Sequence, residues 1–291
     1  MASVAEPAVP AAAQPERPRK TRRIGVSVII AAAWLVALTI AAALAPHLGL
    51  QSPFDGDLLE TLAMPSADHL LGTDSLGRDT LARLLYGGQV SLTVALGSVG
   101  IGLLVGGALG LVAGYFGALA DRVIMGVMTV LLCFPALILA IALIASLGPN
   151  IANVTLAIGI IFVPAFARIT RANTLSLRSR EFVLAAEALG ARLPRILLRE
   201  ILPNLMPALL SYAVVMLGVA ILAEAALGFL GLSVRPPQPS WGGMIASERA
   251  NLADAPQAVF IPAAFLFLTV LAINLLGEAL RRIFDIRAQT L

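Results

Sequence analysis

The sequence predicts an all-α integral membrane protein with six transmembrane helices and both termini on the cytoplasmic side. The chain has 291 residues, of which 59% are hydrophobic and 13% charged, whereas a soluble globular domain carries about 25% charged residues. Six apolar segments are each long enough to cross the bilayer core, which takes about 20 helical residues. Basic residues gather on one side of the resulting topology, as membrane proteins require.

The first 23 residues are predicted to form a disordered, basic cytoplasmic tail, because they are rich in Ala and Pro and end in a basic run. The segment 24–45 follows without a charge and is predicted to be the first transmembrane helix. Its basic start and its small residues at 41–45 also resemble a signal peptide. We favour an uncleaved helix, since 22 apolar residues exceed the roughly 7–15 of a signal-peptide core.

The transmembrane domain is predicted to cover 24–291, and its remaining spans are predicted from hydropathy. Its spans are expected at 90–116, 123–147, 151–170, 207–232 and 258–280, with an outer loop at 46–89 and a cytoplasmic loop at 171–206. Pro135 and Pro164 fall inside spans, where neighbouring helices can satisfy the freed carbonyls.

The distribution of charge supports this orientation. Sixteen of the 20 Lys and Arg residues fall on the cytoplasmic side, and four fall outside. This is the asymmetry of the positive-inside rule, so topology accounts for the basic composition. Nucleic acid is not an expected partner, because the sequence has no basic stripe with interleaved aromatic residues.

Four glycines in the second span follow one another at intervals of four. Residues four apart share a helix face, so these glycines are expected to form a groove where another backbone comes close. The favoured interpretation is packing within the bundle, and the alternative is the contact with a second subunit; spacing does not distinguish them. The four residues are Gly102, Gly106, Gly110 and Gly114.

The cytoplasmic loop 171–206 is long and basic, and it contains a predicted amphipathic helix. Phe182, Ala185, Ala186 and Leu189 fall at i, i+3, i+4 and i+7, which makes one apolar stripe. So small a loop is not expected to bury this stripe by itself. The stripe is therefore expected to dock on the lipid surface or in the groove of a partner protein.

The same loop carries a resemblance to a known family. The run Glu-Phe-Val-Leu-Ala-Ala-Glu-Ala-Leu-Gly at 181–190, followed by Ile-Leu-Pro-Asn at 201–204, resembles the EAA loop of bacterial ABC importer permeases. In that family the loop is a coupling helix seated in a cleft of the ATPase. The family's opening Glu falls on Leu184 here. The matching positions are Ala185, Ala186, Gly190, Leu202 and Pro203.

Two further segments narrow the resemblance to the C-type permeases of the oligopeptide, dipeptide and nickel group. His-Leu-Leu-Gly-Thr-Asp-Ser-Leu-Gly-Arg-Asp at 69–79 resembles the segment before their second helix. Leu-Gly-Phe-Leu-Gly at 227–231 and Pro-Ser-Trp-Gly at 239–242 resemble their fifth helix and the loop after it. A folded cap held by local bonds is the favoured interpretation of the first segment, and contact with a delivering binding protein is the alternative. Its candidate residues are Gly72, Thr73, Asp74, Gly77, Arg78 and Asp79.

Two polar residues inside spans are further candidates. Glu224 is a carboxylate at membrane depth, so it is expected to face the bundle interior or a water-filled cavity. It is expected either to pair with Arg78, Arg83 or Arg235, or to be protonated, and it could line the substrate path or an outer gate. Asn274 in the last span is a weaker candidate of the same kind, since neutral polar residues often bond across helices.

The resemblance implies an ABC importer type I permease fold and a permease subunit that moves peptides into the cell. It implies four kinds of partner: a second permease subunit, two ATPase subunits or one fused chain, an extracytoplasmic substrate-binding protein, and membrane lipid. ATP and Mg²⁺ would be bound by the ATPase, because Lys20 is the only lysine and lies in no P-loop.

No catalytic, cofactor or metal site is expected in this chain. His47 and His69 are the only histidines; they form no zinc motif and are expected at the surface. Import of nickel chelates or another small solute remains an alternative function. So does a secondary transporter, which uses ion gradients and often shows internal repeats, and a membrane enzyme or scaffold is a third class.

Overall fold

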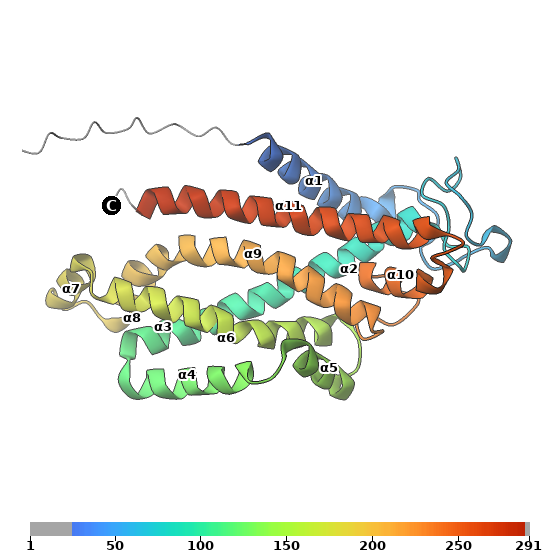
Figure 1. Ribbon diagram of the computed structural model, residues 1–291. Helices are drawn as coiled ribbons and strands as arrows, with labels where there is room; N and C mark the ends of the chain where they lie inside the picture. Colours follow the sequence, from blue (N-terminus) through green and yellow to red (C-terminus); the bar gives the residue numbers. More distant parts are fainter. Residues whose placement is uncertain (1–24, 289–291) are drawn as a thin grey trace, which may run out of the picture.

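The computed structural model describes residues 25–288, with side chains up to residue 282. Long helices run side by side along one axis and give the molecule an elongated shape (Figure 1). In this part of the chain five helices are long and apolar enough to cross a membrane, and a sixth crossing results if one bent pair counts as a span. The helical prediction is confirmed.

Most of the helices follow one another with short connections, and the longest exception is residues 45–79 between α1 and α2. Residues 102–106 form a π-helical segment that joins α2 to α3, and residues 196–201 form another that joins α8 to α9. Two continuous helical rods result, Thr80–Phe116 and Leu193–Phe229. The bounds are α1 Val26–Leu44, α2 Thr80–Ile101, α3 Gly107–Phe116, α4 Ala118–Leu132, α5 Ala136–Leu147, α6 Ile151–Arg178, α7 Glu181–Ala188, α8 Leu193–Arg195, α9 Leu202–Phe229, α10 Trp241–Glu248 and α11 Pro256–Ala288.

The second long helix begins ten residues earlier than predicted, at Thr80 instead of residue 90. Asp79 caps it, since its Oδ1 accepts the backbone N–H of Ala82 at 2.7 Å. Arg83, which reads as a loop residue, is accommodated in the first turn because its guanidinium reaches Asp74 at 3.2 Å and the carbonyl of Pro53 at 2.7 Å. The predicted outer loop therefore ends at residue 79.

The predicted span 123–147 is broken in the middle. Helices α4 and α5 meet at an angle of 87°, and Pro135 lies between them with an extended ψ of 126°. Proline lacks an N–H and its ring clashes with the preceding helical turn, so the chain turns here. Pro164, by contrast, lies inside the uninterrupted helix α6.

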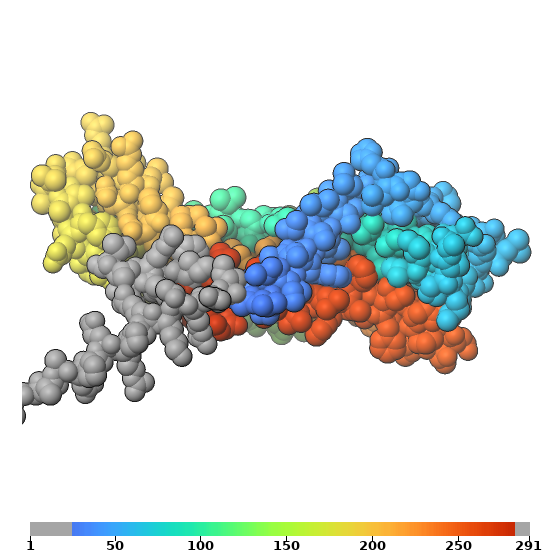
Figure 2. Space-filling model, turned by 90° about the horizontal axis from the view of Figure 1, so that it is seen from above, coloured from blue at the N-terminus to red at the C-terminus, as the bar shows by residue number. Residues whose placement is uncertain are grey.

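The molecule has two distinct ends (Figures 1 and 2). Helix α7 lies at one end, and the last turns of α11 point toward the same end. The opposite end carries α10 and residues 45–79. We call residues 45–79 the cap. The main hydrophobic core lies between these ends and draws on α2, α6, α9 and α11.

Candidate functional site

Helix α7 is attached to the bundle by one buried apolar side chain of its own. Val183 is fully buried and packs in a cluster with Leu111 of α3 and with Ile201, Leu205 and Leu209 around the start of α9. Sequence reasoning did not single out Val183. The apolar stripe through Phe182 and Leu189 lies on another face of the helix. Hydrophobicity alone does not distinguish Val183 from these equally hydrophobic neighbours.

One polar contact adds to this attachment, and a second contact holds the tyrosine that makes it. The hydroxyl of Tyr115, at the end of α3, donates to Glu187 of α7 at 2.9 Å. The guanidinium of Arg178 lies 5.4 Å from the centre of the Tyr115 ring, within the range of a cation–π contact. Helix α7 is thus connected to α3, to the end of α6 and to the start of α9.

The predicted stripe of α7 lies largely on its outer side. Leu189 is 88% exposed and Phe182 is 40% exposed, Ala185 is exposed and Ala186 is half-buried. Gly190 adopts a φ of +75° with open space around it, and this left-handed residue ends the helix. The stripe is therefore available for contact with another molecule.

Leu202 and Pro203 lie where the loop returns to the bundle. Pro203 is the second residue of α9, which directly follows the π-helical segment 196–201, so its missing N–H leaves one bond to that preceding turn unmade. Leu202 is half-buried. Both residues therefore shape the entry into α9 from the π-helical segment before it.

The four glycines at 102, 106, 110 and 114 all face α6 of the same chain. A Cβ on Gly106 would lie 2.4 Å from the carbonyl oxygen of Val163, and one on Gly110 would lie 2.3 Å from that of Ala167. A Cβ on Gly102 would lie 2.8 Å from side-chain atoms of both Phe162 and Phe166, and a Cβ on Gly114 would lie 2.7 Å from Cβ of Thr174. This helix face is filled by α6, which leaves no room on it for a second subunit.

The cap is a folded unit built around Asp74. Its Oδ1 accepts the backbone N–H groups of Leu76 and Arg78 at 2.9 and 3.0 Å. Its Oδ2 accepts from the guanidinium of Arg78 at 2.7 Å and lies 3.2 Å from Nε of Arg83. One buried carboxylate therefore satisfies two arginines and the turn between them.

The remaining cap residues also serve local structure. Thr73 accepts the N–H of Ala63 at 2.8 Å and donates to the carbonyl of Glu60. Gly72 and Gly77 have positive φ, and a Cβ on Gly77 would lie 1.8 Å from the carbonyl oxygen of Asp57. These positions accept only glycine, because both the conformation and the space exclude a side chain.

His69 is buried, contrary to the expectation of a surface residue. It is 4% exposed, and its Nδ1 lies 3.0 Å from Asp79 while its Nε2 lies 2.8 Å from Glu60. The hydrogen bond to Asp79, aided by Glu60, raises the pKa of His69 above its ordinary value of 6.5 in spite of burial. Because Asp79 also caps α2, the histidine connects the cap to the start of that helix.

Glu224 lies near the cap end of α9 and is fully buried. The arginine partners expected for it are wrong: Ser91 of α2 donates to Oε2 at 2.7 Å, and Ser233 donates to Oε1 at 2.6 Å. Arg78 and Arg83 are instead bonded to Asp74. Serine hydroxyls satisfy the carboxyl group and join α2, α9 and the following loop.

Asn274 and the Pro-Ser-Trp-Gly segment lie in different settings. Asn274 is exposed on α11 and bonds within its own helix, to the carbonyl of Val270 at 2.9 Å. Trp241 is fully buried and donates to the carbonyl of Leu84 at 3.0 Å. A Cβ on Gly242 would lie 2.1 Å from the carbonyl oxygen of Ala225, so this segment locks α10 against α2 and α9.

An apolar multi-helix bundle, with a short helix between arginine-rich segments exposed at one end and a folded polar cap at the other, defines a multi-pass membrane protein. The chain belongs to the family of binding-protein-dependent transport system inner membrane components, whose model matches residues 106–290. Membership in this family makes it the membrane-embedded component of a transport system.

Named relatives cover most of the chain. It is 42% identical over 263 residues to the glutathione transport system permease protein GsiD of Pectobacterium atrosepticum, across 89% of this chain and 86% of that protein. It is 40% identical over 251 residues to the dipeptide transport system permease protein DppC of Alkalihalophilus pseudofirmus, across 86% and 83%. These matches confirm the resemblance seen in the sequence.

A solved structure supports the fold. The inward-facing MetNI methionine ABC transporter matches with a TM-score of 0.57 at 19% identity, over 69% of this chain and 95% of that chain. The ABC importer permease fold expected from the sequence is thereby confirmed.

Proposed function

We propose that this chain is a permease subunit of an ATP-driven importer that moves peptides inward across the cytoplasmic membrane. The glutathione and dipeptide permeases at 42% and 40% identity support a small peptide as the cargo. The single observation that carries the coupling to an ATPase is α7, which is anchored by Val183 and yet presents Phe182 and Leu189 outward.

The orientation follows from charge. The α7 end carries many arginines, whereas Arg78 and Arg83 at the cap end are paired with a buried carboxylate. By the positive-inside rule the α7 end is cytoplasmic, and the cap faces outward. The end of α11 lies toward the α7 end (Figure 1), and in this proposal both termini are cytoplasmic.

In this proposal the chain works with four kinds of partner. A second permease subunit completes the path, two ATPase subunits or one fused chain bind ATP and Mg²⁺, a binding protein delivers peptide to the cap end, and lipid surrounds the apolar helices. Exposed apolar side chains on α1 and α4, including Ile30, Val123 and Val130, suit contact with lipid or with the second permease.

Movement at α7 has two routes into the bundle. Val183 and Glu187 bear on α3 through Leu111 and Tyr115, and the helical rod Leu193–Phe229 begins at the same cluster. When the ATPase subunits close on ATP, α7, seated in the cleft of one of them, moves with that subunit and pulls on both rods. The path then changes from inward-facing to outward-facing.

Photo-cross-linking tests the docking of α7 directly. A photoreactive residue in place of Leu189, which is 88% exposed, should capture the ATPase subunit in native membranes. The matched control is Leu48, which is 48% exposed at the opposite end and should capture no ATPase. Equal capture from both positions, or none from Leu189 in membranes that take up peptide, would contradict the proposal.

A further inference from the structure

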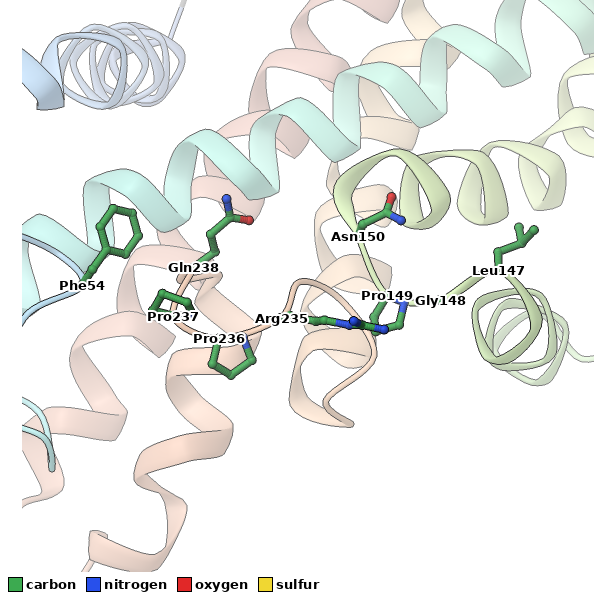
Figure 3. A pocket seen from close by; sticks show the side chains of 9 residues that line it. All are labelled: Phe54, Leu147, Gly148, Pro149, Asn150, Arg235, Pro236, Pro237 and Gln238. Atoms are coloured by element: carbon green, nitrogen blue, oxygen red, sulfur yellow. The ribbon is translucent and has the colours of Figure 1, made fainter.

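A cavity of about 590 Å³ opens beside Phe54 of the cap, and Figure 3 shows the side chains that line it. Three segments that are distant in the sequence line it: Phe54 of the cap, residues 147–150 between α5 and α6, and residues 235–238 between α9 and α10. Small-molecule sites commonly have volumes of about 300–1,000 Å³. The cavity is therefore large enough for part of a small peptide.

The walls of the cavity are mainly apolar, with one charge. Phe54, Leu147 and three prolines supply the apolar surface, and Arg235 is the only charged residue among those that line it. The Arg235 side chain extends across toward Gly148 and Pro149 (Figure 3). Such a lining suits a ligand with an apolar body and a single negative group.

Arg235 differs from the other three arginines at this end. Arg78 and Arg83 are bonded to Asp74, and Arg249 lies over the ring of Phe229 at 5.8 Å. Arg235 is exposed and has no ion pair or side-chain hydrogen bond in the part of the chain that the structure describes. Its planar guanidinium is left with its donors free, and these match a carboxylate in bidentate geometry.

Two amide side chains complete the lining, and one of them is already engaged. Asn150 caps α6, with its Oδ1 accepting the N–H of Asn153 at 2.9 Å. Gln238 has no such bond among the described residues, and it lies on the same loop as Arg235. It offers a donor and an acceptor to a peptide group.

We propose that this cavity is a subsite for the free C-terminal carboxylate of the peptide cargo, which Arg235 binds as the peptide leaves the binding protein. The inference rests on the proposed function. The apolar walls receive the last side chain of the peptide, and Gln238 bonds to its final peptide group. A cationic ligand is excluded by the charge of Arg235, and a wholly apolar one would desolvate the guanidinium without compensation.

The test uses the complete transporter, with its partner subunits, in lipid vesicles. Loaded binding protein is supplied in excess, carrying the same peptide either with a free C-terminal carboxylate or as the C-terminal amide. Arg235→Gln removes the charge at the cavity. Arg249→Gln is the matched control, because Arg249 is also exposed at the cap end but does not line the cavity.

Arg235→Gln is expected to lower the maximal uptake of the free-acid peptide by about tenfold or more, the effect of losing one charge-assisted hydrogen bond. Uptake of the amide should be equal in the variant and the wild type, and Arg249→Gln should keep the wild-type ratio of acid to amide.

Three results would overturn the inference. If Arg235→Gln slows both peptides equally and weakens docking of the loaded binding protein, the carboxylate that Arg235 meets belongs to that protein. If neither peptide is slowed, the cavity holds no cargo, although import by the wild type would leave the proposed function standing. If the wild type imports neither peptide, the proposed function itself fails, and the subsite fails with it.

Discussion

Replacing Gly106 with alanine should push α2–α3 away from α6. The new methyl carbon would lie 2.4 Å from the carbonyl oxygen of Val163 and 3.1 Å from the amide nitrogen of Ala167. Both are backbone atoms that no rotamer change can move, so the helices themselves must separate. The same substitution at Gly100 meets nothing within 4 Å, which makes it a matched control on the same helical rod.

The magnitude follows from two opposing terms. Overpacking a well-filled contact costs about 1–3 kcal/mol, and the higher helix propensity of alanine returns about 1 kcal/mol. Gly106→Ala should therefore lose up to about 2 kcal/mol of folding free energy, while Gly100→Ala should gain about 1 kcal/mol. The two variants differ by about 1–3 kcal/mol, so at about 2–4 °C per kcal/mol for a domain of this size the unfolding midpoint of Gly106→Ala should lie about 2–12 °C below that of Gly100→Ala.

Thermal unfolding of the purified chain in one detergent, at one scan rate, measures this difference. We expect Gly100→Ala to unfold at or above the wild-type temperature and Gly106→Ala to unfold clearly below Gly100→Ala. A midpoint for Gly106→Ala at or above that of Gly100→Ala would refute the close contact between this glycine face and α6.

Two further predictions concern the two ends of the molecule. Val183→Ala should weaken the attachment of α7 by about 1–3 kcal/mol and speed amide exchange over residues 181–188. Leu184→Ala, at a position 51% exposed, should leave that exchange unchanged. Equal exchange in both variants would contradict the attachment. The raised pKa of His69 means that its stabilising charge is fully present below pH 6.5 and is lost as pH rises through the raised value. Amide protection of the cap, corrected for intrinsic exchange, should therefore fall over that range in the wild type and in His47→Gln but not in His69→Gln; a fall that persists in His69→Gln would assign the effect to another group.

The sequence predicts the helical architecture well because hydropathy reports directly on the solvent. Every predicted span falls on helix in the structure, although the span 123–147 is divided into two helices at Pro135. The start of α2 was missed because Arg83 and Gln89 make the segment look too polar for a helix inside the bundle. Their side chains are satisfied by partners distant in sequence, the carbonyls of Pro53 and Ala42, and hydropathy contains no information on such bonds.

The candidate residues were predicted unevenly for the same reason. The stripe of α7 and the glycine face are periodic patterns on one helix, which sequence alone reveals. The serine partners of Glu224 come from α2 and from the loop after α9, and the burial of His69 depends on how Glu60 and Asp79 fold around it. Both are properties of three-dimensional packing. The arginines expected as partners of Glu224 were chosen by charge, whereas its observed partners are neutral serines.

The effect of proline also depended on context. Pro135 and Pro164 both fall in predicted spans, yet only Pro135 interrupts its helix. Pro164 is buried in α6. Its neighbours Val163 and Phe166 contact Gly106 of the π-helical segment 102–106. That support comes from another helix, so the two prolines are indistinguishable in the sequence.

The energy source of peptide uptake tests the central claim most directly. The chain is assembled with its partner subunits in vesicles that contain ATP on the α7 side, and loaded binding protein is added on the cap side. We predict that uptake of labelled peptide requires this ATP and continues after ionophores collapse all ion gradients. Uptake that proceeds without ATP and stops when the proton gradient is collapsed would show a secondary transporter, and would contradict the importer proposed from α7.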